Sequence, residues 1–199
     1  GEEGGRAVAA ALFGSVNPGG KLPLSIPRSV GQIPVFYNHK PSGMHSNIYG
    51  DYYDQQAVPL FCFGHGLSYT SFEYSELKIN PLDVNPGETV EISLDIRNNG
   101  TLAGDEVVQL YLRDEYASFP RPVKELKGFK RLHLKPGETN RLTFHLDTRQ
   151  LAYYDENLEL TLEPGQFAVM IGATSEDIRL TGTFTVLGKD KLFVKDRVF

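Results

Sequence analysis

Two aspartates flank a pair of tyrosines in an aromatic-rich stretch, in the order Asp51, Tyr52, Tyr53, Asp54. A pair of carboxyl groups can hydrolyse a glycosidic bond, one as the acid and the other as the nucleophile or base. Aromatic side chains beside them would present ring faces on which sugars stack. The alternative is that acids so close in sequence only keep a loop solvated, which is the commoner role of such charges. The residues alone favour the solvated loop and leave glycoside chemistry open.

The histidines give no metal-binding pattern. No pair of them has helical ligand spacing on a convincing helix, so neither a metal site nor a cofactor is expected. His133 and His145 alternate with apolar residues, which predicts solvent-facing positions on a sheet. His39 and His45 lie in the aromatic stretch and are the better functional candidates, with a structural hydrogen bond as the alternative for each.

Cysteine chemistry is limited to one residue. A single cysteine, Cys62, excludes an intrachain disulfide and a multi-cysteine zinc site. It stands between two phenylalanines, which predicts a small buried side chain rather than a nucleophile. The Asn99-Gly100-Thr101 sequence fits a glycosylation acceptor, although a tight turn at residues 98–100 explains it better.

Composition narrows the function classes further. The 199 residues carry 20 Lys and Arg against 25 Asp and Glu, and no basic run, so a nucleic-acid partner is not expected. No stretch approaches the length of apolar residues that a membrane helix needs, so no membrane partner is expected. Hydrophobic residues at 40% are enough for a core, and 20 Gly with 12 Pro point to a turn-rich, mainly β protein.

The elements that must position any site are clearest from residue 71 onward, where apolar residues recur with a period of two. Residues 89–96 and 141–146 alternate cleanly, and turns with Pro-Gly at 86–87, 136–137 and 164–165 are typical of type II turns. A short helical turn is expected at 147–151, capped by Asp147. Further strands are expected at 72–79, 106–113, 124–134, 158–162, 166–172 and 179–187. This pattern predicts an immunoglobulin-like or fibronectin-III-like β-sandwich.

The first 70 residues are organised differently. A helix is expected over 2–13, with Gly14 at its C′ position. Residues 21–27 alternate, but Pro23 and Pro27 confine them to an edge strand or an extended connector. A lone helix and strand cannot form a core, so a partner is expected to be missing. Because the chain starts without Met or a signal peptide, we expect a cut edge there, and localisation is unknown.

Charge and aromatic content support the same division. Residues 1–70 have balanced charges, and residues 71–199 carry the whole net charge of −5. The chain has 10 tyrosines and 12 phenylalanines, and nine of these aromatic residues lie within residues 36–72, a stretch with few periodic signals. A long irregular connection is usually functional or disordered, and this aromatic load argues that it packs on another surface.

Together these motifs resemble the C-terminal portion of family 3 glycoside hydrolases, the β-glucosidase and β-xylosidase group. The resemblance covers nearly the whole chain. It rests on four blocks: Gly-Glu-Glu-Gly-Gly-Arg-Ala-Val at 1–8 with Asn-Pro-Gly-Gly-Lys-Leu-Pro at 17–23; residues 27–34 with Tyr-Asn-His-Lys at 37–40; Phe-Gly-His-Gly-Leu-Ser-Tyr-Thr at 63–70; and residues 121–129 with Lys-Pro-Gly-Glu at 135–138.

The resemblance implies three parts. Residues 1–35 would be the C-terminal edge of an α/β sandwich domain, residues 36–70 a connector, and residues 71–199 a fibronectin-III-like sandwich. The expected partners are the barrel and the α/β sandwich domain of the same polypeptide, and the expected substrate is an oligosaccharide or an aryl β-glycoside.

The resemblance also implies retaining hydrolysis of terminal β-D-glucosyl or xylosyl residues by paired carboxylates. Neither carboxylate is carried over, because the family's nucleophile lies in the barrel and its acid/base lies upstream of residues 1–8. The isolated chain is therefore expected to be inactive. Tyr37, His39, Tyr49 and Asp51 are the candidates for lining an outer sugar subsite, with interdomain packing as the alternative. A second reading is a non-catalytic structural or weak glycan-binding module.

Overall fold

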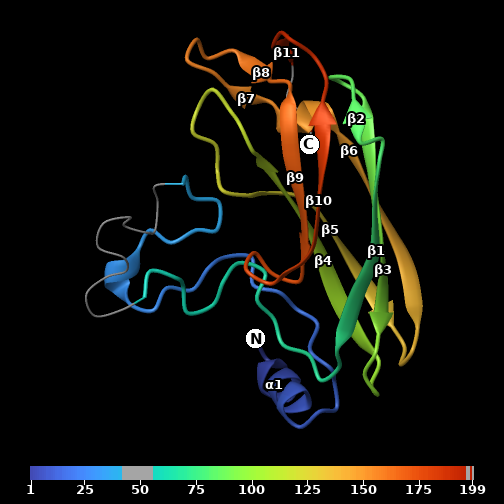
Figure 1. Cartoon of the computed structure of the whole chain (residues 1–199). Coiled ribbons are helices and arrows are strands. Elements are labelled where there is room, and N and C mark those ends of the chain that lie inside the picture. Colours follow the sequence, from blue (N-terminus) through green and yellow to red (C-terminus); the bar gives the residue numbers. More distant parts are fainter. Residues whose placement is uncertain (42–55, 196–197, 199) are drawn as a thin grey trace.

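The computed structural model describes residues 1–41, 56–195 and 198, and strands dominate this part (Figure 1). The element bounds are α1 Gly4–Leu12, the 3-10 turn η1 Val30–Gln32, β1 Phe72–Asn80, β2 Asp83–Val84, β3 Thr89–Asn98, β4 Gly104–Asp114, β5 Glu125–Leu134, β6 Thr139–Asp147, the 3-10 turn η2 Thr148–Leu151, β7 Tyr153–Tyr154, β8 Leu160–Leu162, β9 Gly165–Gly172, β10 Ile178–Val186 and β11 Leu192–Phe193.

Two sheets form a β-sandwich. One has the order β1-β3-β6 and the other the order β2-β10-β9-β4-β5. A small third sheet, β11-β8-β7, lies at the end of the sandwich that is uppermost in Figure 1. The pair β2 and β10 is parallel, whereas β1, β3 and β6 pair antiparallel, as do β10, β9, β4 and β5. The predicted mainly β, fibronectin-III-like fold is confirmed.

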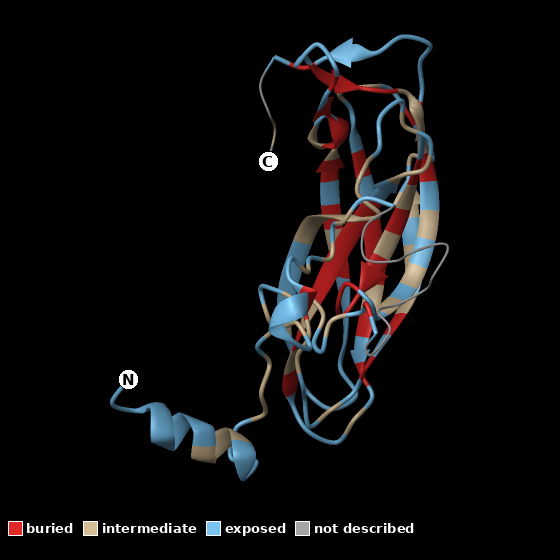
Figure 2. Cartoon of the chain, turned by 90° about the vertical axis from the view of Figure 1, so that its left-hand side faces the viewer, coloured by how far each residue is buried: buried red, intermediate tan, exposed pale blue. Residues whose placement is uncertain are grey.

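The core lies between these sheets because alternate side chains of each strand face inward. In β3, Val90, Ile92 and Leu94 are fully buried, and in β4 Val108 and Leu110 are buried against them. Figure 2 shows the buried residues gathered within the sandwich. The expected strands at 72–79, 89–96, 106–113, 124–134, 141–146, 158–162, 166–172 and 179–187 all overlap observed strands.

Two of the three Pro-Gly turns have the predicted geometry. Gly87 and Gly137 have φ of 89° and 76°, the region that glycine adopts without steric cost. The prediction for Gly165 is wrong, because this residue begins β9 and pairs with Val186, which requires extended backbone. The predicted cap at Asp147 is confirmed, since its side chain accepts a hydrogen bond from the Arg149 backbone N–H at 2.9 Å.

The N-terminal segment stands apart from the sandwich (Figure 2). The predicted helix is present as α1, and Gly14 follows it with φ of 76°. No residue of α1 is buried by the described part of the chain, and Leu12 and Phe13 are 72% and 86% exposed. Residues 21–27 form an extended connector rather than an edge strand, with one isolated bridge between Ile26 and Phe61. Within the described residues, no helix is long and apolar enough to cross a membrane.

A buried acid joins the small end sheet to the loop after β4. The Ser118 hydroxyl and backbone N–H donate to Glu163 at 2.5 and 2.9 Å, and the Lys191 ammonium lies 2.9 Å from the same carboxylate. Burial alone would raise the pKa of Glu163, but these hydrogen bonds outweigh it and lower the pKa to about 2. A carboxyl group whose folded-state pKa is lowered stabilises the fold above its unfolded pKa, near 4.5.

We therefore expect Glu163→Gln to lower the free energy of unfolding by about 1–2 kcal/mol at neutral pH. The difference from the wild type should shrink as the pH falls from about 5 towards 2, where the wild-type carboxylate is itself protonated. Urea unfolding at several pH values measures this, with the exposed Glu159→Gln as the control. A difference that stays constant over this range would contradict the assigned role of the carboxylate.

Candidate functional site

The four predicted subsite residues fall into two groups. Tyr49 and Asp51 lie outside the described residues, as do Asp54 and His45. Tyr37 and His39 are described, and both are half-buried against the sandwich. The structure thus brings Tyr37 and His39 to the same surface, next to the start of β5.

Tyr37 anchors the connector to the sandwich. Its ring stacks on Phe63 with centroids 4.4 Å apart and meets Tyr111 of β4 edge-on at 5.7 Å. Its hydroxyl oxygen accepts a hydrogen bond from the Leu126 backbone N–H of β5 at 3.3 Å. Burial raises the pKa of the Tyr37 phenol, so the hydroxyl remains protonated. The ring contacts are those of a packing residue, and Tyr37 also lines a cavity beside β5.

That cavity has a volume of about 400 Å³ and combines an aromatic edge with charged groups. Arg121 lies over the Tyr153 ring, 4.5 Å from its centroid, and its guanidinium is 3.4 Å from the Glu125 carboxylate. Lys127 contacts the same carboxylate at 2.9 Å. Such a surface can donate hydrogen bonds to a polar ligand and accept them from it, and its one described carboxylate is already paired with two cations.

His39 is fixed mainly through its backbone. Its carbonyl oxygen accepts a hydrogen bond from the Val123 N–H at 2.9 Å, and its Nδ1 lies 2.9 Å from the Lys40 carbonyl oxygen. The ring borders a cavity of about 50 Å³ that Ser175 and Glu176 also line. This volume holds little more than ordered water. A subsite role for His39 stays a prediction.

Residues 56–70, here called the docking segment, are the last part of the connector and join the extended residues 21–27 to the sandwich. The Leu22 N–H donates to the His65 carbonyl and the Gly64 N–H donates to the Leu22 carbonyl, both at 2.8 Å. The Phe63 carbonyl accepts a hydrogen bond from the Ser175 N–H of the sandwich at 2.9 Å. Cys62 in this segment is half-buried rather than buried as predicted. Its neighbours Phe61 and Phe63 contact His65 and Tyr37, respectively.

Asp114, at the end of β4, is a carboxyl group that the sequence did not single out. Burial raises its pKa, which is a property of general acids. Its carboxylate accepts a hydrogen bond from the Tyr116 backbone N–H at 3.2 Å, so it closes the turn that follows the strand. The residue therefore has a structural contact with its own turn, and it also lines a cavity of about 510 Å³.

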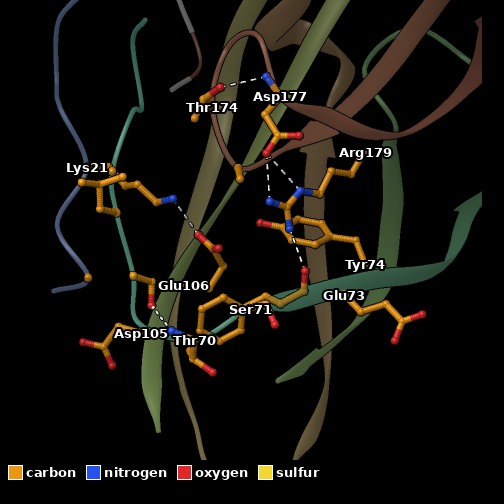
Figure 3. A pocket seen from close by; sticks show the side chains of 16 residues that line it. Lys21, Thr70, Ser71, Glu73, Tyr74, Asp105, Glu106, Thr174, Asp177 and Arg179 are labelled. Carbon is orange, nitrogen blue, oxygen red and sulfur yellow. Dashed lines mark hydrogen bonds and ion pairs between the residues drawn. The ribbon is translucent and has the colours of Figure 1, made fainter. Parts of the chain in front are cut away.

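A further polar cavity lies where residues 19–21 and the docking segment meet the sandwich, and it too was missed by sequence reasoning (Figure 3). Its groups include Lys21, Tyr74, Glu106 and Arg179. One signal was available, since Glu106 has the same strand parity as the inward-facing Val108 and Leu110. An acid on the inward face of a strand needs a partner, and here it is the Lys21 ammonium at 3.0 Å.

Two family profiles match the chain. Residues 1–69 match the glycosyl hydrolase family 3 C-terminal domain, and residues 106–175 match a fibronectin type III-like domain. A β-xylosidase of Formosa agariphila is 46% identical over 176 residues, which is 88% of this chain and 24% of that protein. A periplasmic β-glucosidase of Salmonella typhimurium is 42% identical over 193 residues, 94% of this chain and 25% of that protein.

Solved structures give the same picture. A β-glucosidase from Listeria innocua in complex with glucose matches with a TM-score of 0.86 and 39% identity, over 92% of this chain and 26% of that one. The β-glucosidase 3B from Thermotoga neapolitana matches with a TM-score of 0.76 and 32% identity, over 96% of this chain and 28% of that one. The chain thus spans about a quarter of the length of its curated relatives.

Proposed function

This chain belongs to glycoside hydrolase family 3, and from that premise we propose that it is the C-terminal part of a retaining β-glycosidase. The complete enzyme would hydrolyse terminal non-reducing β-D-glucosyl or xylosyl residues. The observation that carries the proposal is the presence of two family profiles, at residues 1–69 and 106–175, in a chain that matches relatives about four times its length.

Each part of the chain has a proposed role. Residues 1–35 are the C-terminal edge of an α/β sandwich domain, residues 36–70 the connector, and residues 71–199 the sandwich. The exposed apolar side chains of Leu12 and Phe13 support the first role, because such a surface is stable once another domain covers it. The partners are accordingly the barrel and α/β sandwich domains of the same polypeptide.

The catalytic carboxylates are proposed to lie outside this chain. Retaining hydrolysis needs one carboxyl group that can be protonated and one free to act as a nucleophile. Three acids that line the two polar cavities described above face cations: Glu106 faces Lys21, Glu125 faces Arg121 and Lys127, and Asp177 faces Arg179. Ion pairs of this kind connect parts of the fold, which suits structural acids.

We further propose that the connector reaches an outer sugar subsite through Tyr37, His39, Tyr49 and Asp51. For Tyr37 the contribution would come from its hydroxyl edge, since its ring packs on Phe63 and Tyr111. Tyr37→Phe in the complete enzyme would then raise KM for an oligosaccharide more than for an aryl β-glucoside.

The proposal predicts that the isolated 199-residue chain does not hydrolyse aryl β-glucosides or aryl β-xylosides. Release of nitrophenol from both substrates measures this directly. Turnover that one Asp or Glu substitution abolishes would show that a catalytic carboxylate is present after all.

The test of the whole proposal is the coding sequence upstream of residue 1, expressed together with this chain. The complete polypeptide should contain a barrel domain and should release glucose or xylose from the same substrates. An open reading frame without a barrel would overturn the proposal. The alternative, a structural or weak glycan-binding module, would then remain, with the polar cavity of Figure 3 as its supporting feature.

A further inference from the structure

The polar cavity between the connector and the sandwich has no role in the proposed hydrolysis. Its volume is about 450 Å³, within the range of small-molecule sites. Lys21, residues 66–68 and Thr70 form one wall, and side chains of β1, β4, β10 and the loop before β10 form the other (Figure 3). It is therefore built by the contact between the two parts of the chain.

The group that most needs a ligand is the Tyr74 hydroxyl. Tyr74 is only 8% exposed, and its hydroxyl oxygen is buried with no hydrogen-bond partner. Figure 3 shows this hydroxyl pointing into the cavity, towards the space between Glu106 and Asp177. Burial, and next to it the charge of Glu106, raise the pKa of Tyr74 far above its usual range, so the group stays protonated and can donate.

Most of the acids around this hydroxyl are paired with cations. The Lys21 ammonium is 3.0 Å from the Glu106 carboxylate, and the Arg179 guanidinium is 2.8 Å from the Asp177 carboxylate. A third acid on the wall, Asp105, is paired with Arg131 and lies 2.6 Å from His133. A fourth acid, Glu73, also lines the cavity and is exposed to solvent. Because three of the four acids are already paired, we favour a neutral ligand over a metal ion or an anion. The cavity offers donors and acceptors side by side, which suits a neutral ligand rich in hydroxyl groups.

We propose that this cavity binds a monosaccharide unit, with the Tyr74 hydroxyl as a hydrogen-bond donor to a sugar hydroxyl. The choice of a sugar over other polyols rests on the proposed function. Arg179 covers one face of the Tyr74 ring, 4.6 Å from its centroid, so sugar stacking on that face is excluded. Binding depends on hydrogen bonds and has a dissociation constant of roughly millimolar order.

The test is a titration of the ¹⁵N-labelled chain with D-glucose, and separately with D-xylose, up to about 50 mM. We expect saturable shifts at the backbone amides of Tyr74, Glu106 and Arg179. Tyr74→Phe removes only the unpartnered hydroxyl and should weaken binding about 3- to 10-fold. Tyr116→Phe is the matched control, because Tyr116 is 83% exposed and does not line the cavity, and it should leave binding unchanged.

Two outcomes would overturn the proposal: no saturable shift with either sugar, whether or not Ca²⁺ or inorganic phosphate gives one, or equal binding by the wild type and Tyr74→Phe. Loss of the fold does not confuse the comparison, since removing a buried hydroxyl without a partner should preserve or raise Tm. The readout is binding by the isolated chain, whereas the proposed hydrolysis is measured on the complete polypeptide, so the two can fail separately.

Discussion

Replacing Gly64 by alanine is expected to lower the stability of the docked connector by about 3–4 kcal/mol. Gly64 has φ of 81°, where an L-residue is strained. An added Cβ would lie 2.6 Å from Nε2 of Gln109 and closer still to Oε1 of the same side chain. Both effects act at the point where the docking segment meets β4.

Gln109 cannot move aside without further loss. It is 3% exposed, its amide donates to the Ala173 carbonyl at 2.6 Å, and it accepts a hydrogen bond from the Tyr111 hydroxyl at 2.5 Å. Shifting the side chain would leave these two buried groups without partners, at about 1–3 kcal/mol each. The strained backbone would add about 1–2 kcal/mol. Part of this total would be recovered by relaxation of the segment.

Substitutions at two other glycines distinguish the backbone strain from the contact with Gln109. Gly137 has φ of 76° with nothing near its Cβ position, so Gly137→Ala reports the backbone strain alone. Gly20→Ala has neither strain nor a nearby atom and should have almost no effect. Urea unfolding, together with hydrogen exchange at the Gly64 and Ser175 amides, measures the three variants. If Gly64→Ala costs no more than Gly137→Ala, the contact with Gln109 is not important.

Gly64 illustrates what the sequence can and cannot predict. The glycine is visible in the Phe-Gly-His-Gly pattern, but the reason for it is Gln109, which is distant in sequence and follows no periodic signal. The long strands were predictable because alternation over six to eight residues, as at 89–96 and 141–146, is a local signal. The two-residue strands β2, β7 and β11 are too short to show alternation, and none was predicted.

The candidate site was also predictable only in part from the sequence. Aromatic content predicted that the connector packs on another surface, and Tyr37 does so on Phe63 and Tyr111. The polar cavity was not predictable, because it depends on how Lys21 crosses β4 to reach Glu106. The parity of Glu106 predicted at most an inward-facing acid. Its partner is determined by the tertiary contact between the connector and the sandwich.

Asn98 shows how a residue expected in a turn can have a larger role. It is the last residue of β3 and fully buried. Its side-chain amide donates to the Leu102 and Leu134 carbonyls at 2.8 and 3.0 Å. Its side-chain oxygen accepts from the Thr70 hydroxyl at 2.7 Å and from the Gly100 N–H at 3.1 Å. One side chain therefore joins the end of the docking segment to the loop after β3 and to the end of β5.

Asn98→Ala is accordingly expected to lower the free energy of unfolding by about 3–5 kcal/mol, because it leaves several buried donors and acceptors without partners. Asn99→Ala is the matched control, because Asn99 is exposed. In the described structure its side-chain oxygen accepts one hydrogen bond, from the Ser71 hydroxyl at 2.7 Å. The loss of unfolding free energy should therefore stay below about 1 kcal/mol. Asn98→Asp keeps the acceptor for Thr70 but turns a second oxygen towards two carbonyls, and it should be nearly as destabilising as alanine. Chemical unfolding of the three variants tests this order. Equal losses for Asn98→Ala and Asn99→Ala would mean that the position is an ordinary turn, as the sequence alone predicted.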